Sequence, residues 1–424
     1  MWLLKGGTLC CPLTGRSGQA DLRVEGGHIT EIGPGLEPRG ERFVQCAGLT
    51  LIPALVDLAS ELGDPGETWR EDLRSGGAAA AAGGFGTVVV SPNTAPAIDS
   101  ASAVQDLLSR AGGLSGARLR VAGALTAALA GRELAELNDL VEAGAVALSD
   151  GGRGMGDALV LRNALDYARP LGVPVFTRPC EPTLEERGAM HEGEVSAAIG
   201  LHGIPAASEE IGVLRTLALA RLTGCAVHLS HVTTARGVEL LRQARAEGLA
   251  VTSAVPARHL LLTDQDIDDM EYNSNLRLLP PLRPERDRAA VVRAVQEGVI
   301  DVVSADHVPW TRVEKEQEFM LASPGAVGLE SAFAAAMTAL GDLELVVMAM
   351  SARPAARIGQ RAALEVGALA DLALVDPDER APLPCPRFSR GMNEPLAGRS
   401  LRGRVHATFV AGALAWANPA LVIR

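Results

Sequence analysis

Short apolar runs alternate with helical segments through the middle of the sequence, and this alternation constrains the fold most strongly. Each run has about five residues rich in Val, Ala and Leu, and a stretch with helical spacing follows it. The eight runs are ALVDLAS, TVVVSPN, RLRVAGAL, AVALSDG, VPVFTRP, CAVHLSH, LAVTSAV and DVVSADH. Eight strand–helix units are the number that closes a (β/α)8 barrel. The sequence therefore predicts an α/β fold with a TIM barrel over residues 53–364.

The two ends of the chain have a different pattern. The N-terminal runs LLKGGTLCC, ADLRVEGG and HITEIGPG and the C-terminal runs ADLALVDPD and RVHATFVAGALAWA are short, strand-like and separated by glycine turns. We expect residues 1–52 and 365–424 to form together a small β-sandwich domain that flanks the barrel.

Composition excludes several classes of function. The net charge of −12 at pH 7 argues against a surface that binds nucleic acid or an anionic membrane. The opening MWLLKGGTLCCPLTG lacks the long apolar region of a signal peptide. The six cysteines form neither a CxxC pair nor a dense framework, which is typical of reduced thiols. We expect a cytoplasmic protein without a nucleic-acid or membrane partner.

The ends of the early strands carry little metal chemistry. In a TIM barrel the functional groups lie at the C-terminal ends of the strands. Alternate positions after the first strand would point two ligands at one metal, but they hold Ala59, which cannot coordinate, and Glu61, which can. The fourth strand ends at a single carboxylate, Asp150, and the fifth at Arg178, whose permanent positive charge opposes a cation.

The sixth and eighth strands offer better candidates. His228 and His231 are an odd number of residues apart, so on a strand only one of them faces the barrel mouth. The eighth strand ends at Asp306 and His307, a pair suited to a general base or a metal ligand. A packed or hydrogen-bonded histidine and a loop-capping aspartate are the simpler interpretations of the same residues.

The ordered set of motifs resembles a known family. DPGETWREDLRSGGAAAAAGGFGTVVVSPNTAP, GAVALSDGGRGM, HLSHVTT, PPLRPERDRAAVV and GVIDVVSADHVPW have the order and spacing found in the longer bacterial dihydroorotases of the amidohydrolase superfamily. The resemblance covers essentially the whole chain. It implies a TIM barrel with a flanking β-sandwich, a zinc site and a place in pyrimidine biosynthesis.

Most of the family's metal ligands are replaced. By the resemblance, the two zinc-binding histidines of a D-x-H-x-H motif fall on Ala59 and Glu61. The bridging acidic residue falls on Gly151, and the next histidine falls on Arg178. A following histidine is kept as His231. The resemblance therefore implies that few ligand positions remain.

The family's substrate-handling residues are also partly replaced. By the resemblance, Asp306 is the retained catalytic aspartate, Asn93 is a retained substrate contact, and His307 belongs to the same vestigial pocket. The changed positions are a histidine that is now Trp310, the carboxylate-binding arginine that is now Gly63, and an asparagine that is now Leu279.

Parallel loss of ligands and substrate contacts favours a non-catalytic homologue. We expect no cofactor and no bound metal, with Asp306 and His231 as vestiges. By family analogy, the partner is the catalytic chain of aspartate transcarbamoylase, which this protein would assemble or stabilise. We also expect a homodimer, because closed two-fold association is the commonest oligomeric form.

Two alternatives stay open. The first is an active cyclic-amide hydrolase whose mononuclear zinc site is rebuilt from Glu61, Cys180, His191, His231 and Asp306. The second is a ligand-sensing module that uses the old pocket without chemistry, with Arg178 and Asn93 as anion contacts.

Overall fold

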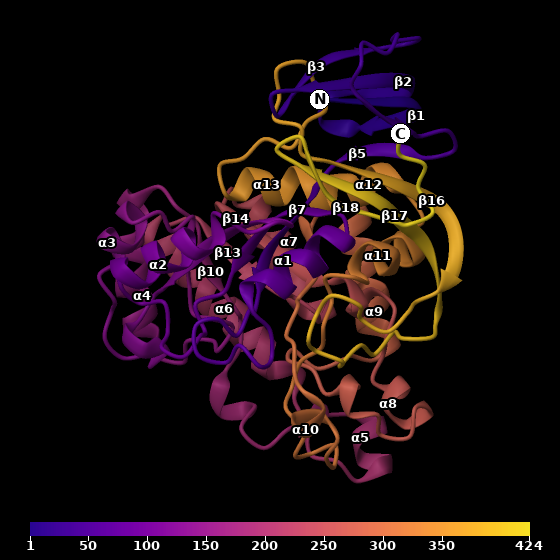
Figure 1. Ribbon diagram of the computed structural model, residues 1–424. Coiled ribbons are helices and arrows are strands. Elements are labelled where there is room, and N and C mark those ends of the chain that lie inside the picture. The colour runs from indigo at the N-terminus through magenta and orange to yellow at the C-terminus, as the bar shows by residue number, and fades with distance from the viewer.

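Eight parallel strands form the predicted barrel in the computed structural model, which describes residues 1–424 (Figure 1). All eight apolar runs of the sequence are strands, so the barrel prediction is confirmed. The strands are β6 (Leu55–Ser60), β7 (Phe85–Val90), β8 (Arg118–Ala124), β9 (Ala147–Ser149), β10 (Val175–Thr177), β13 (Val227–Ser230), β14 (Val251–Pro256) and β15 (Val302–Ser304).

A helix follows each barrel strand and packs outside it. These helices are α1 (Leu73–Ala82), α2 (Ala101–Ala111), α3 (Leu137–Glu142), α4 (Ala158–Ala168), α6 (Ala206–Thr223), α7 (Ala235–Ala246), α9 (Glu285–Gln296) and α11 (Ala332–Leu340). Local sequence sets their ends. Asp72 caps α1 by accepting a hydrogen bond from Ser75 N at 2.7 Å, and α6 ends at Gly224, whose φ is 69°.

Hydrogen bonds join the first barrel strand to the last. The carboxylate of Asp57 on β6 accepts from Ala305 N, just beyond β15, at 2.7 Å and from Ser60 Oγ at 2.7 Å. Glu61 N donates to His307 O at 2.8 Å. Asp57 is fully buried, and this burial raises its pKa. These contacts fix the relative positions of the first and last strand ends, where the candidate site lies.

The two ends of the chain form one mixed sheet beside the barrel, as predicted. Antiparallel pairing of β5 with β16, in the register Leu372–Pro53, joins the two segments. The boundaries of the two domains stay a prediction. The strands of this terminal sheet are β1 (Trp2–Cys11), β2 (Arg16–Glu25), β3 (His28–Gly33), β4 (Arg42–Gln45), β5 (Thr50–Pro53), β16 (Leu372–Pro382), β17 (Ser400–Val410) and β18 (Ala413–Ala417).

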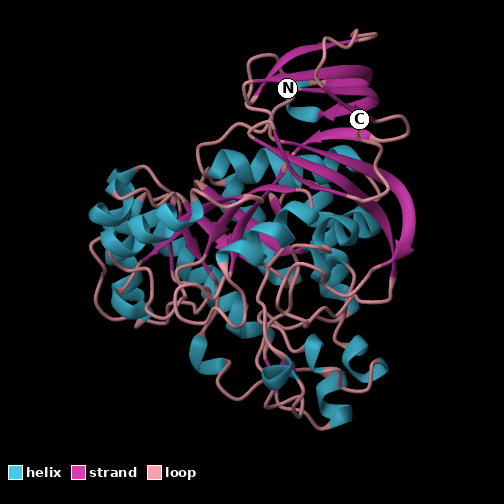
Figure 2. Cartoon of the chain, in the orientation of Figure 1, coloured by secondary structure: helices cyan, strands magenta, loops and turns pink.

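The barrel mouth faces away from the terminal sheet. The sheet strand β5 runs directly into the start of β6, so the sheet adjoins the N-terminal ends of the barrel strands. Figure 2 shows loops gathered at the opposite end of the molecule. The shorter elements are α5 (Glu194–Ile199), α8 (Gln265–Asp269), α10 (Arg312–Lys315), α12 (Leu343–Val347), α13 (Arg353–Arg357), β11 (Met190–His191), β12 (Gly203–Ile204) and a π-helical turn (Met348–Ala352).

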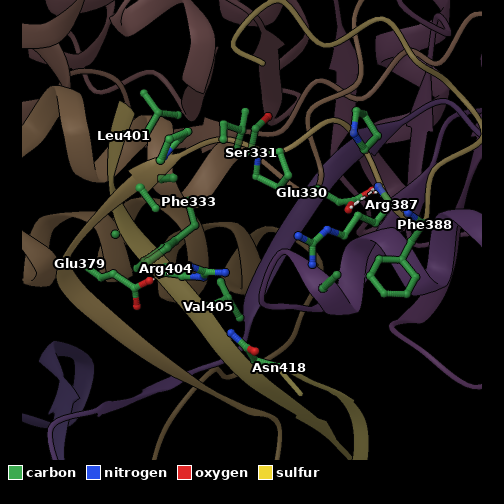
Figure 3. Close-up of a pocket in the computed structure, with 18 of the residues that line it drawn as sticks. Glu330, Ser331, Phe333, Glu379, Arg387, Phe388, Leu401, Arg404, Val405 and Asn418 are labelled. Atoms are coloured by element: carbon green, nitrogen blue, oxygen red, sulfur yellow. Dashed lines mark hydrogen bonds and ion pairs between the residues drawn. The ribbon is translucent and has the colours of Figure 1, made fainter. Parts of the chain in front are cut away.

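A crevice of about 120 Å³ lies between α11, β17 and the loop that precedes β17 (Figure 3). Phe333 of α11 and Val405 of β17 give it apolar walls, and Arg387 and Arg404 also line it. None of its lining residues belongs to a barrel strand. No helix of the structure is both long and apolar enough to cross a membrane.

Candidate active site at the barrel mouth

The C-terminal ends of the barrel strands surround a cavity of about 570 Å³. Most residues that the sequence singled out meet there, although they come from strands far apart in the chain. Those that line the cavity are Ala59, Glu61, Asn93, Asp150, Gly151, Arg178, His231, Leu279, Asp306 and Trp310. His307, Gly63, Cys180 and His191 are not part of its lining.

Asp306 is held by an arginine that the sequence reasoning missed. Arg258 lies in the 3-10 turn Ala257–Leu260 after β14, and its Nη1 donates to Asp306 Oδ2 at 2.6 Å. Its Nη2 donates to the carbonyls of Ala305 and Asp306 at 2.9 and 2.6 Å. Both side chains are buried. The only sequence signal was a charged residue inside the apolar run AVPARHLLL.

This pairing sets the protonation state of Asp306. Burial alone raises the pKa of a carboxyl group, but the attraction of His231 when it is protonated and of the permanently charged Arg258 outweighs burial here, so the pKa of Asp306 lies below its usual range. The carboxylate is therefore a weak base that is already neutralised by a guanidinium.

His231 adopts an unusual backbone conformation at the mouth. β13 ends at Ser230, and His231 has a φ of 118°. Strand alternation therefore does not determine where its ring points. Its Nδ1 lies 3.7 Å from Asp306 Oδ1, and its Nε2 has no hydrogen-bond partner. Burial lowers the pKa of His231. His228 packs deeper, edge-on against Phe176, and does not line the cavity.

The guanidinium of Arg178 forms an ion pair with Glu185. Its Nη1 and Nη2 donate to the two carboxylate oxygens of Glu185 at 3.0 and 2.7 Å. Asp150 Oδ2 in turn accepts from Thr177 Oγ1 at 2.6 Å and from Arg178 N at 3.0 Å. The carboxylate of Asp150 therefore holds the ends of β9 and β10 together. The charge of Arg178 is neutralised by Glu185. The predicted anion contact at Arg178 stays a prediction, and its guanidinium must leave Glu185 to serve it.

Two glycines mark positions where this chain has no room for the family's side chains. Gly151 has a φ of 64°, and a Cβ there would lie 2.8 Å from Leu129 Cδ1. At Gly63 a Cβ would lie 2.3 Å from the carbonyl oxygen of Glu67. An arginine at 63 thus requires the backbone at Glu67 to move, whereas an aspartate at 151 must displace the Leu129 side chain and adopt a left-handed φ.

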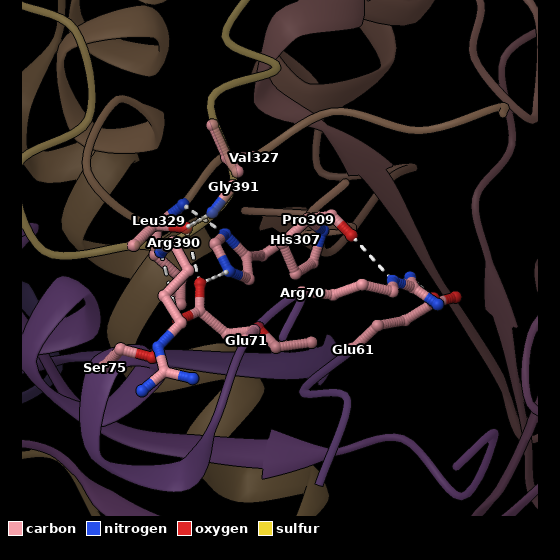
Figure 4. A network of polar contacts seen from close by, with 12 residues as sticks. Glu61, Arg70, Glu71, Ser75, His307, Pro309, Val327, Leu329, Arg390 and Gly391 are labelled. Atoms are coloured by element: carbon pink, nitrogen blue, oxygen red, sulfur yellow. Dashed lines mark hydrogen bonds and ion pairs between the residues drawn. The ribbon is translucent and has the colours of Figure 1, made fainter. Parts of the chain in front are cut away.

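Trp310 and Arg70 form one wall of the cavity. The guanidinium carbon of Arg70 lies 3.5 Å from the centroid of the Trp310 ring, a cation–π contact. Arg70 Nε donates to Pro309 O at 3.0 Å, and its Nη2 lies 3.5 Å from Glu61 Oε2 (Figure 4). Burial raises the pKa of Glu61. Arg70 is the second residue that the sequence reasoning missed.

His307 points away from the cavity that we predicted for it. Its Nε2 donates to Glu71 Oε2 at 3.2 Å, and its Nδ1 accepts from Gly328 N at 3.2 Å (Figure 4). Glu71 also accepts a hydrogen bond from Ser389 Oγ. The ring therefore helps to attach the loop around residue 389 to the barrel and does not border the cavity.

Of the five residues proposed for a rebuilt zinc site, Glu61, His231 and Asp306 line the cavity, whereas Cys180 and His191 lie outside it. Burial raises the pKa of the Cys180 thiol to about 12, and its Sγ lies 3.9 Å from Arg153 O. His191 Nδ1 lies 3.2 Å from Arg283 Nη1, and burial together with that arginine lowers its pKa to about 4. Nowhere in the chain do three or more His, Cys, Asp or Glu side chains converge to hold a metal ion. The side chains present do not fit a zinc centre.

Comparison with known proteins identifies the family. A family model described as "Dihydro-orotase-like" matches residues 48–236. A dihydroorotase of Pelotomaculum thermopropionicum is 40% identical over 97% of each chain, and one of Anaeromyxobacter dehalogenans is 37% identical over 96% of each. The chain belongs to the dihydroorotase family. This confirms the resemblance drawn from its motifs.

Solved structures support the fold of this dihydroorotase-family protein. The L-hydantoinase of Arthrobacter aurescens superposes with a TM-score of 0.87, covering 99% of this chain and 97% of that one, at 22% identity. A D-hydantoinase from Bacillus sp. AR9 superposes with a TM-score of 0.84 at 22% identity. At such low identity the likeness shows the fold alone.

The comparisons also correct one prediction. We expected no cofactor, yet relatives that match this chain over nearly its whole length are named dihydroorotase, and dihydroorotases are metal-dependent, zinc-using enzymes. The prediction of no cofactor is therefore wrong. The side chains at this barrel mouth therefore differ from those that a zinc site requires.

Proposed function

We propose that this dihydroorotase-family protein serves pyrimidine biosynthesis without catalysing hydrolysis. The observation that carries the proposal is the buried ion pair between Arg258 and Asp306. A general base must be free to take up a proton and needs a pKa near the working pH. Asp306 has a lowered pKa and an arginine on its carboxylate, so it is poorly suited to that role.

The rest of the mouth supports the same proposal. The two ligand positions of the first strand hold an alanine, Ala59, and a carboxylate, Glu61, that lies beside Arg70. Arg178 stands at a further ligand position and is neutralised by Glu185. The guanidinium groups of Arg70 and Arg178 are thus both paired with carboxylates of the protein itself.

We propose further that the barrel protein binds the catalytic chain of aspartate transcarbamoylase and stabilises its assembly. The argument is by family analogy. It is supported by a scaffold that keeps its capped helices and buried strand contacts although the site has changed.

A mixing experiment tests this partnership. We expect the protein and the transcarbamoylase chain from the same organism to co-elute in size-exclusion chromatography at micromolar concentration, at a mass above that of either alone. We also expect the transcarbamoylase to unfold at a higher temperature in the complex, because binding to the native state stabilises it. Two separate peaks and unchanged unfolding would contradict the proposed partner, and each protein run alone is the control.

A second candidate function, ligand sensing in the old pocket, is favoured by two unpartnered polar atoms. Asn93 Oδ1 and His231 Nε2 are buried, belong to residues that line the cavity, and have no hydrogen-bond partner in the protein. A ligand that supplies both partners would remove their desolvation cost.

Thermal unfolding with added metabolites tests the sensing role. Dihydroorotate, carbamoyl aspartate or orotate at about 100 times its dissociation constant should stabilise the protein by about 2.7 kcal/mol. Asn93→Leu should abolish the shift, while Asn163→Leu on the exposed face of α4 should leave it intact. An unchanged unfolding temperature at millimolar ligand would exclude this candidate.

A further inference from the structure

A second cavity lies at the N-terminal end of the barrel, on the side of the terminal sheet. It has a volume of about 290 Å³ and is lined by residues near the start of β6, β7 and β8. The segment after α13 and the turn before β16 complete its walls with Gln360, Arg361 and Asp371. Figure 1 shows α13 between the barrel strands and the terminal sheet. This cavity is therefore at the opposite end of the barrel from the candidate active site.

Arg120 occupies a position inside the barrel that is usually apolar. It lies on β8 in register with Val89 of β7. Val89 and Ala122 belong to an apolar cluster that also takes residues from β9, β14 and β15, which meet only in the barrel interior. Because side chains alternate along a strand, Arg120 faces the same interior. Branched apolar residues dominate such layers in TIM barrels, so a guanidinium here needs a partner.

The chain supplies no such partner. Arg120 is half-buried, its Nε is buried without a hydrogen-bond partner, and it takes part in no ion pair. Asp371 is the one acidic residue of the lining, and its carboxylate accepts from Arg118 Nη1 and Nη2 at 2.8 and 3.2 Å. The same carboxylate accepts from Ala411 N at 2.6 Å. A bound anion would remove the desolvation cost of the unpaired guanidinium.

The lining carries an excess of positive charge in an acidic protein. The arginines Arg118, Arg120 and Arg361 line the cavity, against the single aspartate Asp371. Arg361 pairs with Glu365 at 2.9 Å, but both side chains are exposed, by 61% and 37%, so solvent screens this pair. The chain as a whole has a net charge of −12. A positive recess in a negative protein attracts a small anion.

Charge, donors and size together favour a phosphate group. The two positive charges in excess match a phosphate dianion, whereas a carboxylate would neutralise only one. Guanidinium groups bind phosphate oxygens through pairs of N–H donors, and Thr87 and Gln360 add neutral hydrogen-bonding groups to the lining. Small-molecule sites measure about 300–1,000 Å³, so a cavity at the lower end of this range suits phosphate or a small phosphate ester.

We propose that this cavity, lined by Arg118, Arg120, Gln360, Arg361 and Asp371 and here called the basal cavity, binds a phosphate-bearing metabolite through Arg120. The site is separate from the barrel mouth and does not rest on the proposed function. Its walls come from the barrel, the segment after α13 and the turn before β16, so a bound anion would join these three parts. Free phosphate and a phosphate monoester share this chemistry, and the two are distinguished by titration.

Calorimetric titration of the full-length protein tests the site. The probes are inorganic phosphate and glycerol 3-phosphate, in a buffer without phosphate and at constant ionic strength. We expect a single saturable site per chain with a dissociation constant below about 1 mM for at least one probe. Acetate should bind at least about tenfold more weakly, because it carries a single charge. The tighter of the two phosphate probes identifies the source of the phosphate group.

Arg120→Met removes the guanidinium and keeps a long side chain. It should weaken binding of the phosphate probes at least about tenfold. Arg236→Met, at an exposed arginine of α7 outside the basal cavity, is the matched control and should bind like the wild type. Without phosphate, Arg120→Met should unfold at the wild-type temperature or above it, because the lost charge had no partner. A structural arginine would instead lower that temperature and leave phosphate binding unchanged.

Gln360→Glu tests the same site with an isosteric change, which keeps the proposal falsifiable if Arg120→Met does not fold. It adds a negative charge to the lining and should weaken phosphate binding at least about tenfold. Gln105→Glu, on the exposed face of α2, makes the same chemical change elsewhere and should bind like the wild type. Circular dichroism establishes that each variant is folded.

Three results would overturn the proposal. The first is the absence of saturable binding of either phosphate probe up to about 10 mM. The second is binding that folded Arg120→Met or Gln360→Glu leaves unchanged. The third is acetate binding as tight as that of phosphate, which would indicate a general anion recess and not a phosphate site.

Discussion

Hydrolysis of dihydroorotate by this protein is expected to be at least about 10⁴-fold slower than by an active relative, even with zinc added to the assay. A catalytic zinc needs about three protein ligands and an open position for a water whose pKa the metal lowers. The cavity offers Ala59 at one ligand position, and Arg258 neutralises Asp306. The reaction should therefore lack both its activated water and its base.

The measurement follows the interconversion of dihydroorotate and carbamoyl aspartate in both directions. The Pelotomaculum thermopropionicum dihydroorotase, 40% identical, is the positive control under the same conditions. A rate within about 100-fold of this control would contradict the non-catalytic proposal if the Asp306→Ala variant lost it. Glu61, His231 and Asp306 would then be the residues to examine as ligands, because all three line the cavity.

Arg258→Met is expected to destabilise the fold by about 3–5 kcal/mol, because it leaves the carboxylate of Asp306 buried without its partner. The substitution also removes the donors to the carbonyls of Ala305 and Asp306. Urea unfolding measures the change as a shift in midpoint at constant slope. Arg312→Met, at a side chain 71% exposed, is the control and should change stability by less than about 0.5 kcal/mol.

The double variant Arg258→Met, Asp306→Leu distinguishes the loss of the ion pair from the cost of leaving one buried charge unpaired. It should be more stable than Arg258→Met, since an apolar pair can replace a buried ion pair at little cost. If the double variant is no more stable than the single one, the destabilisation comes from lost packing and not from the uncompensated charge.

Lowering the pH should weaken the ion pair between Arg258 and Asp306. The pKa of Asp306 is lower in the folded protein than in the unfolded chain, so its contribution is complete above the unfolded value of about 3.9 and is lost as the pH falls through the folded value. Arg258→Met removes one cause of the lowered pKa. The stability difference between wild type and variant should therefore shrink as the pH falls from the pKa of Asp306 in the folded variant to its lower pKa in the folded wild type.

The sequence determined the scaffold of this protein. The eight apolar runs, their helical intervals and the strand-like ends of the chain rest on local periodicity and glycine turns, which need no tertiary information. The residues at the strand ends followed from the same periodicity, because a barrel strand presents its C-terminal end to the mouth. The resemblance to the dihydroorotases then showed that Ala59, Gly151 and Arg178 replace metal ligands of that family.

Only the tertiary structure decided which charges meet. Arg258 and Asp306 are 48 residues apart and come together because β14 and β15 are neighbours in the barrel. Strand periodicity does not specify the rotamers that pair the guanidinium of Arg178 with Glu185 at the cavity wall and turn His307 out of the cavity towards Glu71.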